Sequence, residues 1–223
     1  SWFPLPHEKD WLESVIREVK ATRASVGLCD VSTLGKIDVQ GPDAAAFLDF
    51  VYTNTMSTLP VGKVRYGLML REDGHVMDDG TCARFGEGHF VITTTTAAAA
   101  LVMRQLEFVA QGLRPDLDVQ LVSVTEQWAT TAVVGPHARK ILQVLAPAMD
   151  FSNAAFPFMT FREGEVAGMS ARVFRISFSG ELAYEINVPA WQGLAMWQAV
   201  MDAGRAFDLT PYGTESMHVV RAE

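Results

Sequence analysis

The amino-acid sequence predicts an α+β fold in which antiparallel sheets pack against helices. Two short turns, Glu72-Asp73-Gly74 and Gly86-Glu87-Gly88, join strand-like segments directly, as hairpin turns do. Segments with helical spacing of apolar residues lie between these strands. The chain has 223 residues, of which 49% are hydrophobic and 20% charged, which is enough for one large domain or two small ones. Hairpins combined with crossing helices favour antiparallel sheets over a doubly wound parallel sheet.

The N-terminal elements follow from apolar spacing and turn residues. Residues 8–25 carry apolar side chains at helical spacing with charges between them, which predicts an amphipathic helix. Gly27 ends this helix, and a strand is predicted over residues 28–39. The turn that follows contains Pro42, which favours the start of a second helix over Ala44–Val51.

Strands and helices alternate through the rest of the chain. We predict strands over residues 64–70, 75–84, 89–94, 119–124, 128–134, 166–177 and 182–188, and helices over residues 97–111, 136–145 and 189–204. The approximate subdomains are residues 1–115 and 116–223 of one module. The first residue is not Met and the last residues carry no stop signal, so we expect a fragment of a longer protein.

One sequence pattern occurs twice. Val39-Gln40-Gly41-Pro42 precedes one predicted helix, and Val134-Gly135-Pro136 precedes another. Each pattern runs from a strand through a Gly-Pro turn into a helix. A duplicated unit would explain the repeat, and so would common turn chemistry, because Pro is frequent at the first helical position.

Composition excludes several functional classes. The formal net charge is −8 and there is no basic run, so we expect neither a nucleic-acid partner nor an anionic membrane partner. No apolar run is long enough to span a bilayer, and no signal peptide is evident, which predicts a cytoplasmic protein. Cys29 and Cys82 lie in apolar strands and are expected to be free buried thiols. The histidines show no metal-ligand spacing, so no metal site is predicted.

The adjacent carboxylates Asp78 and Asp79 are the first candidate for chemistry. Neighbouring residues of a strand point to opposite faces, so one of the pair is expected to face inward. A carboxylate in an apolar sheet has costly desolvation and can accept a hydrogen bond or a proton from a ligand nitrogen. The alternative is an acidic pair at a hairpin end that faces solvent.

Other candidates lie at strand ends. Thr95 belongs to a run of four threonines that can cap a helix or offer hydroxyls to a ligand. Phe178 could stack on a planar ring, and Glu181 and Glu185 would share a face of a regular strand. Tyr66 offers a ring and a hydroxyl, although such a residue is more often part of a core. The sequence has no P-loop, dinucleotide fingerprint or nucleophile elbow.

Taken in order along the chain, four motifs resemble the aminomethyltransferase family, that is, the folate-binding T-protein of glycine cleavage and its relatives. The motifs are Asp30-Val31-Ser32, residues 62–66, residues 74–79, and Ser179-Gly180-Glu181 through Glu185. Further stretches, such as residues 32–37 and 211–218, are similar to the branch that forms the C-terminal part of the α subunit in heterotetrameric sarcosine oxidases. Dimethylglycine dehydrogenase is a more distant relative.

The resemblance implies a role for each matching residue. Asp79 matches the carboxylate that contacts the folate nitrogens carrying the one-carbon unit, and is thereby the inward-facing member of its pair and the catalytic residue. The residues that match folate-binding positions are Tyr66, Thr95 in place of an Asn, Phe178 in place of a Tyr, Glu181, and Glu185 at the pterin ring. The arginine expected near the folate tail aligns with Met217, and Arg221 lies one helical turn further on.

The resemblance also implies cofactors and partners. The expected fold is that of the aminomethyltransferases, with ferredoxin-like subdomains and without the C-terminal β-barrel that follows in the family. The expected ligand is tetrahydrofolate, which would accept the methylene of oxidised sarcosine and form 5,10-methylene-tetrahydrofolate. FAD, FMN and NAD are expected elsewhere in the complex, including a flavin-bearing β subunit. A stand-alone aminomethyltransferase and a non-enzymatic folate-binding module are the alternatives.

Overall fold

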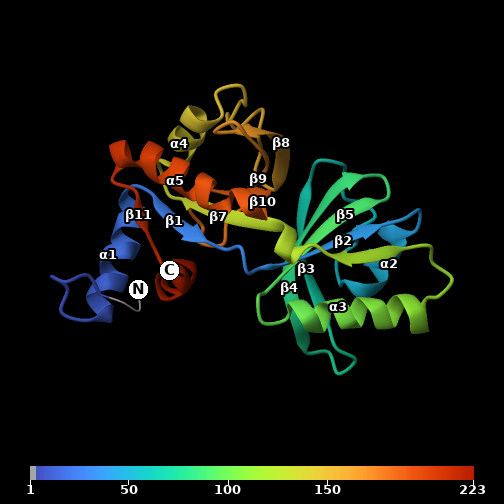
Figure 1. The fold of residues 1–223 in the computed structure, drawn as a ribbon. Coiled ribbons are helices and arrows are strands. Elements are labelled where there is room, and N and C mark those ends of the chain that lie inside the picture. Colours follow the sequence, from blue (N-terminus) through green and yellow to red (C-terminus); the bar gives the residue numbers. More distant parts are fainter. Residues whose placement is uncertain (1–3) are drawn as a thin grey trace. The chain divides into compact units, whose positions relative to one another are not determined.

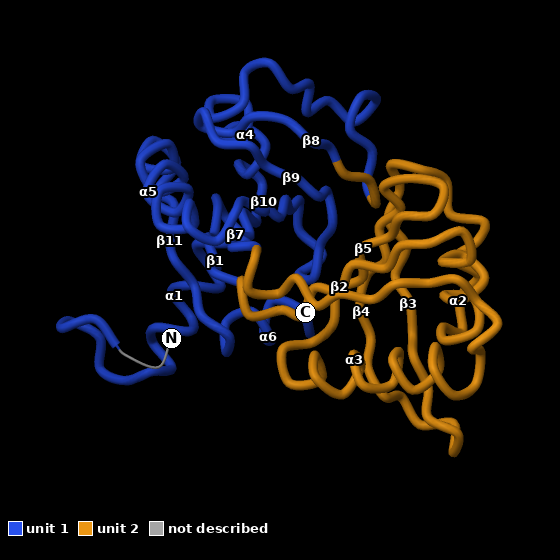
Figure 2. Tube along the Cα trace, turned by 45° about the vertical axis from the view of Figure 1, so that its right-hand side comes forward, with its two compact units in different colours: residues 1–31, 128–158, 162–223 blue, residues 32–127, 159–161 orange. Residues whose placement is uncertain are grey.

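The computed structural model of the chain describes residues 4–223. These residues form two compact units, shown in Figure 2 in blue and orange. Unit 1 comprises the residues up to Val31, Trp128–Phe158 and Arg162–Glu223, and unit 2 comprises Ser32–Gln127 and Met159–Phe161. These boundaries differ from the consecutive subdomains expected from the sequence, because the first strand pairs with strands from the second half of the chain.

Unit 2 is built on a five-stranded sheet in the order β3-β4-β5-β2-β6. Its strands are β2 (Gly35–Gln40), β3 (Val64–Leu70), β4 (Val76–Gly86), β5 (His89–Thr94) and β6 (Gln120–Ser123). Every pair of neighbours is antiparallel. The sheet buries Ile37, Cys82 and Ile92 on one face, because they lie opposite one another in register on β2, β4 and β5.

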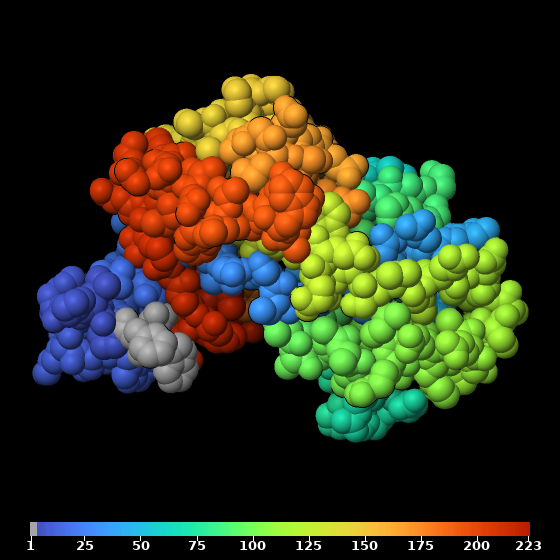
Figure 3. All heavy atoms as spheres, viewed as in Figure 1, coloured from blue at the N-terminus to red at the C-terminus, as the bar shows by residue number. Residues whose placement is uncertain are grey.

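Two helices cover that face of the unit 2 sheet (Figure 1). They are α2 (Ala44–Val51) and α3 (Ala99–Phe108), and α3 continues into a wider π-helical turn over Val109–Leu113. Phe47 and Leu48 of α2 and Val102 and Leu106 of α3 complete the core. The outer side chains of α3 appear in green in the space-filling view of Figure 3, which agrees with the exposure of Leu101.

Unit 1 contains a six-stranded sheet in the order β11-β1-β7-β10-β9-β8. Its strands are β1 (Gly27–Asp30), β7 (Trp128–Val134), β8 (Thr160–Val166), β9 (Met169–Arg175), β10 (Ala183–Pro189) and β11 (Thr210–Pro211). β1 runs parallel to β11 and antiparallel to β7, which in turn pairs with β10. The order brings the first strand of the chain beside the last.

Helices lie on both faces of the unit 1 sheet. α4 (Ala138–Leu145) and α5 (Gly193–Gly204) pack against one face, where Tyr184 and Val133 are fully buried. On the other face Tyr212 packs on Cys29, with Met217 of α6 (Thr214–Ala222) at the edge of the cluster. α1 (Trp11–Ala24) packs against α6 through a small apolar cluster of Val15, Val19 and Val220. Short 3₁₀ turns span Thr125–Gln127, Ala190–Gln192 and Arg205–Phe207.

The repeated Gly-Pro sequence adopts the same geometry in each unit. Gly41 joins β2 to α2 with φ +140°, and Gly135 joins β7 to α4 with φ +129°. A Cβ atom at Gly41 would lie 2.2 Å from a backbone oxygen, and one at Gly135 would lie 2.5 Å from another. Only glycine fits such turns without strain. The sequence repeat therefore corresponds to one strand–turn–helix motif in each unit.

Several predicted elements have the predicted bounds, and two predicted strands are wrong. The strand predicted over residues 166–177 is divided by a turn at Ala167 and Gly168, so Val166 ends β8 and only Met169–Arg175 forms β9. Ala44–Val51, Val64–Leu70, His89–Thr94 and Trp128–Val134 are confirmed. The single strand predicted over residues 28–39 is two strands, β1 and β2, which lie in different sheets. Between them the buried ammonium of Lys36 donates to the carbonyl oxygens of Ser32 and Leu34 at 3.0 and 2.9 Å, which replaces strand pairing there.

Within residues 4–223, no helix is both long and apolar enough to cross a membrane.

Candidate functional site

The β3–β4 hairpin of unit 2 brings Tyr66 and Asp79 together. Asp79 is in register with Leu68, two residues along β3 from Tyr66, so both side chains lie on the same face of the sheet. The Tyr66 hydroxyl donates to Oδ2 of Asp79 at 2.8 Å. Tyr66 is 47% exposed, and Asp79 is half-buried. One predicted catalytic residue and one predicted binding residue are therefore joined by a hydrogen bond.

Asp78 points to the opposite face of the sheet from Asp79, as strand geometry predicts. The member of the pair that faces inward is Asp78. Asp78 is only 7% exposed, on the face that α2 and α3 cover. The expectation that Asp79 faces inward is therefore wrong. The reason is the register of the strands. Asp78 is paired with the buried Met69 and lies on the same face of β4 as the buried Cys82, so even-numbered residues of β4 face the helices.

Thr95 binds Asp78. Its N–H donates to Oδ2 of Asp78 at 3.0 Å, and its hydroxyl donates to Oδ1 at 2.7 Å. These two hydrogen bonds compensate for the burial of the carboxylate. The structure thus gives Thr95 a protein partner, and it identifies Asp78 as a residue whose role the sequence reasoning missed. Extending the hairpin register from Cys82↔Ile92 would have placed these residues near one another.

In unit 1, a second group of predicted residues lies at the loop between β9 and β10 and on α6. The guanidinium of Arg221 lies over the ring of Phe178, 4.8 Å from its centroid. His218, one turn earlier on α6, meets the edge of the same ring at 6.4 Å between centroids. Phe178 is 46% exposed, so its ring and the Arg221 cation form an accessible apolar and cationic surface.

Glu181 is paired within the chain. Nη1 of Arg23 lies 2.9 Å from Oε1 of Glu181 and also donates to the carbonyl of Ser179 at 3.3 Å. Nη2 of the same arginine donates to the carbonyl of Val220 at 2.6 Å. Arg23 therefore joins α1, the loop and the end of α6. No sequence signal indicated this residue, because its partners lie more than a hundred residues away along the chain.

Glu185 lies on β10, in register with Ala132 of β7 and Phe174 of β9. This places it on the sheet face that carries Cys29 and Tyr212. Burial first, and then the charges of nearby carboxylates including Glu185, raise the pKa of the Cys29 thiol to about 11. β10 begins at Ala183, so the strand alternation expected to relate Glu185 to Glu181 does not apply.

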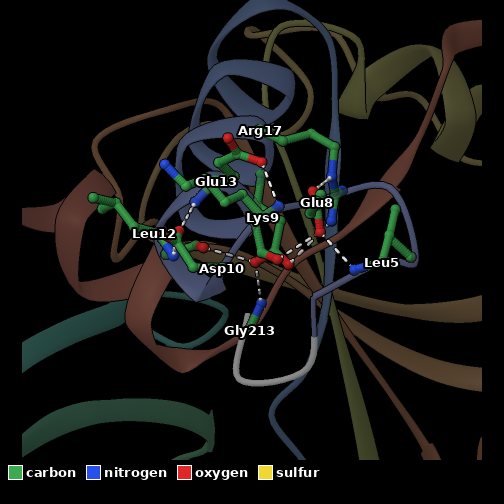
Figure 4. Close-up of polar contacts among 11 residues, drawn as sticks. Leu5, Glu8, Lys9, Asp10, Leu12, Glu13, Arg17 and Gly213 are labelled. Carbon is green, nitrogen blue, oxygen red and sulfur yellow. Dashed lines mark hydrogen bonds and ion pairs between the residues drawn. The ribbon is translucent and has the colours of Figure 1, made fainter.

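A buried carboxylate anchors the helix that carries Arg221. Oε2 of Glu18 accepts from the N–H of Gly213 at 3.0 Å and from the hydroxyl of Ser216 at 2.6 Å, both at the start of α6. Figure 4 shows Gly213 beside α1, together with Arg17 and its partner Glu8. The Arg17 guanidinium and two other donors hold the pKa of Glu8 at about 2. This anchoring network was not predicted from the sequence.

The predicted site residues therefore fall into two groups. Tyr66, Asp79 and Thr95 belong to unit 2, whereas Phe178, Glu181, Glu185 and Arg221 belong to unit 1. Among residues 4–223, no group of three or more His, Cys, Asp or Glu side chains could hold a metal ion. Unit 2 therefore provides a carboxylate, Asp79, with a hydroxyl donor. Unit 1 provides an aromatic ring with a cation, Phe178 and Arg221, and a further carboxylate, Glu185.

Comparisons of sequence identify relatives of the whole chain. The family model described as GCVT N-terminal domain matches residues 1–223. The chain is 54% identical over 225 residues to the sarcosine oxidase subunit alpha of Rhizobium meliloti (strain 1021), covering 100% of this chain and 23% of that protein. It is 32% identical over 210 residues to an aminomethyltransferase of Thermotoga petrophila, covering 94% of this chain and 56% of that protein.

Solved structures agree with this relationship. The glycine cleavage system aminomethyltransferase T of Bartonella henselae superposes with a TM-score of 0.79 at 26% identity, over 93% of this chain and 53% of that chain. A chain of the heterotetrameric sarcosine oxidase of Corynebacterium sp. U-96 has a TM-score of 0.61 at 17% identity, over 87% of this chain and 93% of that chain, which shows a shared fold. Since the family model covers the chain from end to end, the protein belongs to the GCVT N-terminal domain family.

Proposed function

We propose that this chain binds tetrahydrofolate and receives a one-carbon unit there, as the folate-binding part of a sarcosine oxidase α subunit. The observation that carries the proposal is the hydrogen bond between Tyr66 and Asp79. The relatives support it, because sarcosine oxidase α subunits match the chain over its whole length and aminomethyltransferases match nearly all of it. The chain spans 23% of the length of the first of these relatives, so the activity of the whole protein is part of the proposal.

The residues present fit a reduced folate. Its pterin ring presents several N–H donors, which carboxylates accept well. Oδ2 of Asp79 accepts from Tyr66, and Oδ1 accepts no hydrogen bond from the described residues. Glu185 offers a second carboxylate at a half-buried position. Aromatic surface is available at Phe178, where a planar ring could stack.

Asp79 carries the chemistry in this proposal. When bound, tetrahydrofolate would supply the amines N5 and N10, which would take the methylene of an imine in exchange for glycine, with the two amine protons going to the glycine nitrogen. Asp79 would orient the amine through Oδ1 and hold the proton in transit. The Tyr66 hydroxyl would keep the carboxylate in place, because it donates a hydrogen bond to Oδ2.

The unit 1 residues are assigned to binding. Glu185 would accept from the pterin ring, and Phe178 would stack on a flat part of the ligand. Arg221 would attract the carboxylate tail of the folate, since its guanidinium lies over the Phe178 ring near the end of α6. Glu181 is paired with Arg23 and would act by holding the loop that carries Phe178.

The reaction needs a partner that makes the imine. A flavin-bearing subunit would oxidise the N-methyl amino acid, with the flavin accepting two electrons, and the resulting imine would pass to this chain. FAD, FMN and NAD would lie elsewhere in the complex. We place the protein in the cytoplasm, because Cys29 and Cys82 are both free thiols, as is usual in a reducing compartment.

Binding and turnover of three proteins test the assignment. In the full-length protein with its natural partner subunits, tetrahydrofolate affinity is measured by calorimetry, and sarcosine turnover is divided between 5,10-methylene-tetrahydrofolate and free formaldehyde. We expect Asp79→Asn to divert turnover to formaldehyde with little change in affinity, and Glu185→Gln to weaken affinity itself. The matched controls are Asp73→Asn at the tip of the same hairpin and Glu165→Gln on β8, both exposed.

The outcomes separate the alternatives. Equal losses of affinity in Asp79→Asn and Glu185→Gln would refute the division of roles. Absence of tetrahydrofolate binding in the unchanged protein would refute the function. Binding without methylene transfer would leave a non-enzymatic folate-binding module. Transfer of an aminomethyl group from a lipoyl protein would instead indicate an aminomethyltransferase. One protein of that name is 32% identical to this chain.

A further inference from the structure

Strands β4 and β5 are joined in an unusual way beside Asp79. Regular register between them ends at Cys82↔Ile92. Beyond this point, the N–H of Thr81 donates to the hydroxyl of Thr93 at 2.9 Å, and the two threonine hydroxyls lie 2.8 Å apart. Thr95 then donates its N–H and its hydroxyl to Asp78. We call these four residues, Asp78, Thr81, Thr93 and Thr95, the polar ladder.

The polar ladder lies on one side of Asp79, and ordinary backbone pairing lies on the other. Residues on both sides of Asp79 are in register with β3, as Met69↔Asp78 and Gly67↔Gly80. On the β5 side, a Cβ atom at Gly80 would lie 1.9 Å from the carbonyl oxygen of Thr93, so the two backbones approach as closely as glycine allows. The backbone of Asp79 is therefore held from both sides.

An irregularity in β4 immediately precedes the aspartates. Leu70 pairs with Val76 and Met69 pairs with Asp78, so Met77 is an extra residue in β4, as in a β-bulge. Bulges bend a strand and change the direction of the side chains that follow. Without a fixed anchor on the β5 side, the strand after the bulge could shift its register and move Asp79 away from Tyr66. Asp78 supplies that anchor through its two hydrogen bonds to Thr95.

We propose that the polar ladder positions Asp79, so that Asp78 and Thr95 act on one-carbon transfer through the geometry of Asp79 and do not contact the folate. This inference rests on the proposed function for its catalytic consequence. Burying a carboxylate costs more than burying an apolar side chain, and fold stability alone gives no reason for one here. The directional bonds of a carboxylate fix the backbone of its neighbour, which apolar packing does not do to the same degree.

The test uses a spectroscopic readout of the Tyr66–Asp79 contact that needs no folate. 3-Fluorotyrosine is placed at position 66 of the full-length protein, and its ¹⁹F resonance is compared in the unchanged protein and in Asp79→Ala, which removes the acceptor. The same resonance is then measured in Thr95→Val, which keeps the shape and the N–H but removes the hydroxyl. Thr96→Val is the matched control, because the Thr96 hydroxyl is exposed and contacts Thr33. If Thr95→Val does not fold, Asp78→Asn takes its place. Asparagine has nearly the same shape as aspartate but has one acceptor oxygen fewer for the two donors of Thr95.

We expect Thr95→Val to move the resonance toward its position in Asp79→Ala, and Thr96→Val to leave it unmoved. Transfer of methylene to tetrahydrofolate should fall by about 100-fold in Thr95→Val while affinity for tetrahydrofolate changes by less than about threefold, as for a small displacement of a catalytic group. A resonance that stays in place in folded Thr95→Val and Asp78→Asn overturns the positioning role. A resonance that moves in a protein without tetrahydrofolate affinity supports the ladder and overturns the proposed function instead.

Discussion

The anchoring of α6 by Glu18 leads to a quantitative prediction. The carboxylate is 4% exposed; its Oε2 accepts from the Gly213 N–H and the Ser216 hydroxyl, and its Oε1 lies 3.6 Å from Nη2 of Arg17. In Glu18→Ala both donors lose their acceptor. Ser216 is fully buried, so its hydroxyl should cost about 2–3 kcal/mol, whereas Gly213 is partly exposed and should cost about 1 kcal/mol. The expected loss in the free energy of unfolding is therefore about 3–4 kcal/mol.

The variant Glu18→Gln separates charge from shape. Its amide oxygen can still accept both hydrogen bonds, and only the charge is lost. Because hydrogen bonds to an ionised acceptor are roughly twice as strong as neutral ones, we expect about half of the effect seen in Glu18→Ala. Glu13→Ala is the matched control, since Glu13 lies on the same helix, is exposed, and accepts from the N–H of Lys9 only at the surface. Its cost should be less than about 1 kcal/mol.

Urea denaturation followed by tryptophan fluorescence measures these differences. The described tryptophans, Trp11, Trp128, Trp191 and Trp197, all belong to unit 1, so their emission follows the unit that contains Glu18. Domains are typically stable by only about 5–15 kcal/mol, so the loss expected for Glu18→Ala should lower the midpoint visibly. Equal midpoints for Glu18→Ala and Glu13→Ala would refute the reasoning, because they would show that the buried carboxylate contributes no more than a surface one.

Three further predictions follow from burial, charge and backbone spacing. Burial raises the pKa of Cys29 to about 11 and that of Cys82 to about 12, so Ellman's reagent at pH 8 should label both thiols only after denaturation, and rapid labelling of the native protein would contradict their burial. Hydrogen bonds lower the pKa of Glu8 from 4.5 to about 2, so its contribution to stability is complete above pH 4.5 and is lost as the pH falls toward 2; Glu8→Gln should flatten that limb of the pH–stability curve measured by urea denaturation. Gly80→Ala should destabilise by about 1–3 kcal/mol in thermal denaturation through its clash with β5, whereas Gly86→Ala, whose Cβ would lie 3.6 Å from the nearest atom, should cost less.

Much of the fold could be predicted from local sequence. The strands Val64–Leu70 and Trp128–Val134 have apolar, β-branched or alternating sequences bounded by turn residues, and their bounds are confirmed. β8 was missed because its middle residues, Arg162 to Glu165, are polar and give no strand periodicity. A helical turn was expected between Met217 and Arg221, but the anchoring of α6 was missed because it depends on Glu18, a residue that only the tertiary structure brings near. Local patterns thus predict elements with clear apolar spacing of their own, including β7, whose partners β1 and β10 are distant in sequence.

The candidate site shows the same limit. Tyr66 and Asp79 could be related from the sequence because a single hairpin joins their strands, and the hairpin register follows from a short turn. The pairing of Arg23 with Glu181 could not, because 158 residues separate them. The direction in which Asp78 and Asp79 point also depended on tertiary structure: strand alternation separates the two side chains, but only the positions of α2 and α3 decide which face is covered.

The two aspartates illustrate how one dipeptide can serve two purposes. A residue on the covered face of a sheet can be held rigidly by hydrogen bonds, but it is remote from a ligand on the other face. A residue on the open face can meet a ligand, but exposure leaves its side chain more freedom. Placing both in succession joins the rigidity of Asp78 to the accessibility of Asp79 through one peptide bond. On this argument, exchanging the chemistry of the first aspartate should disturb the reaction of the second without any contact between Asp78 and the ligand.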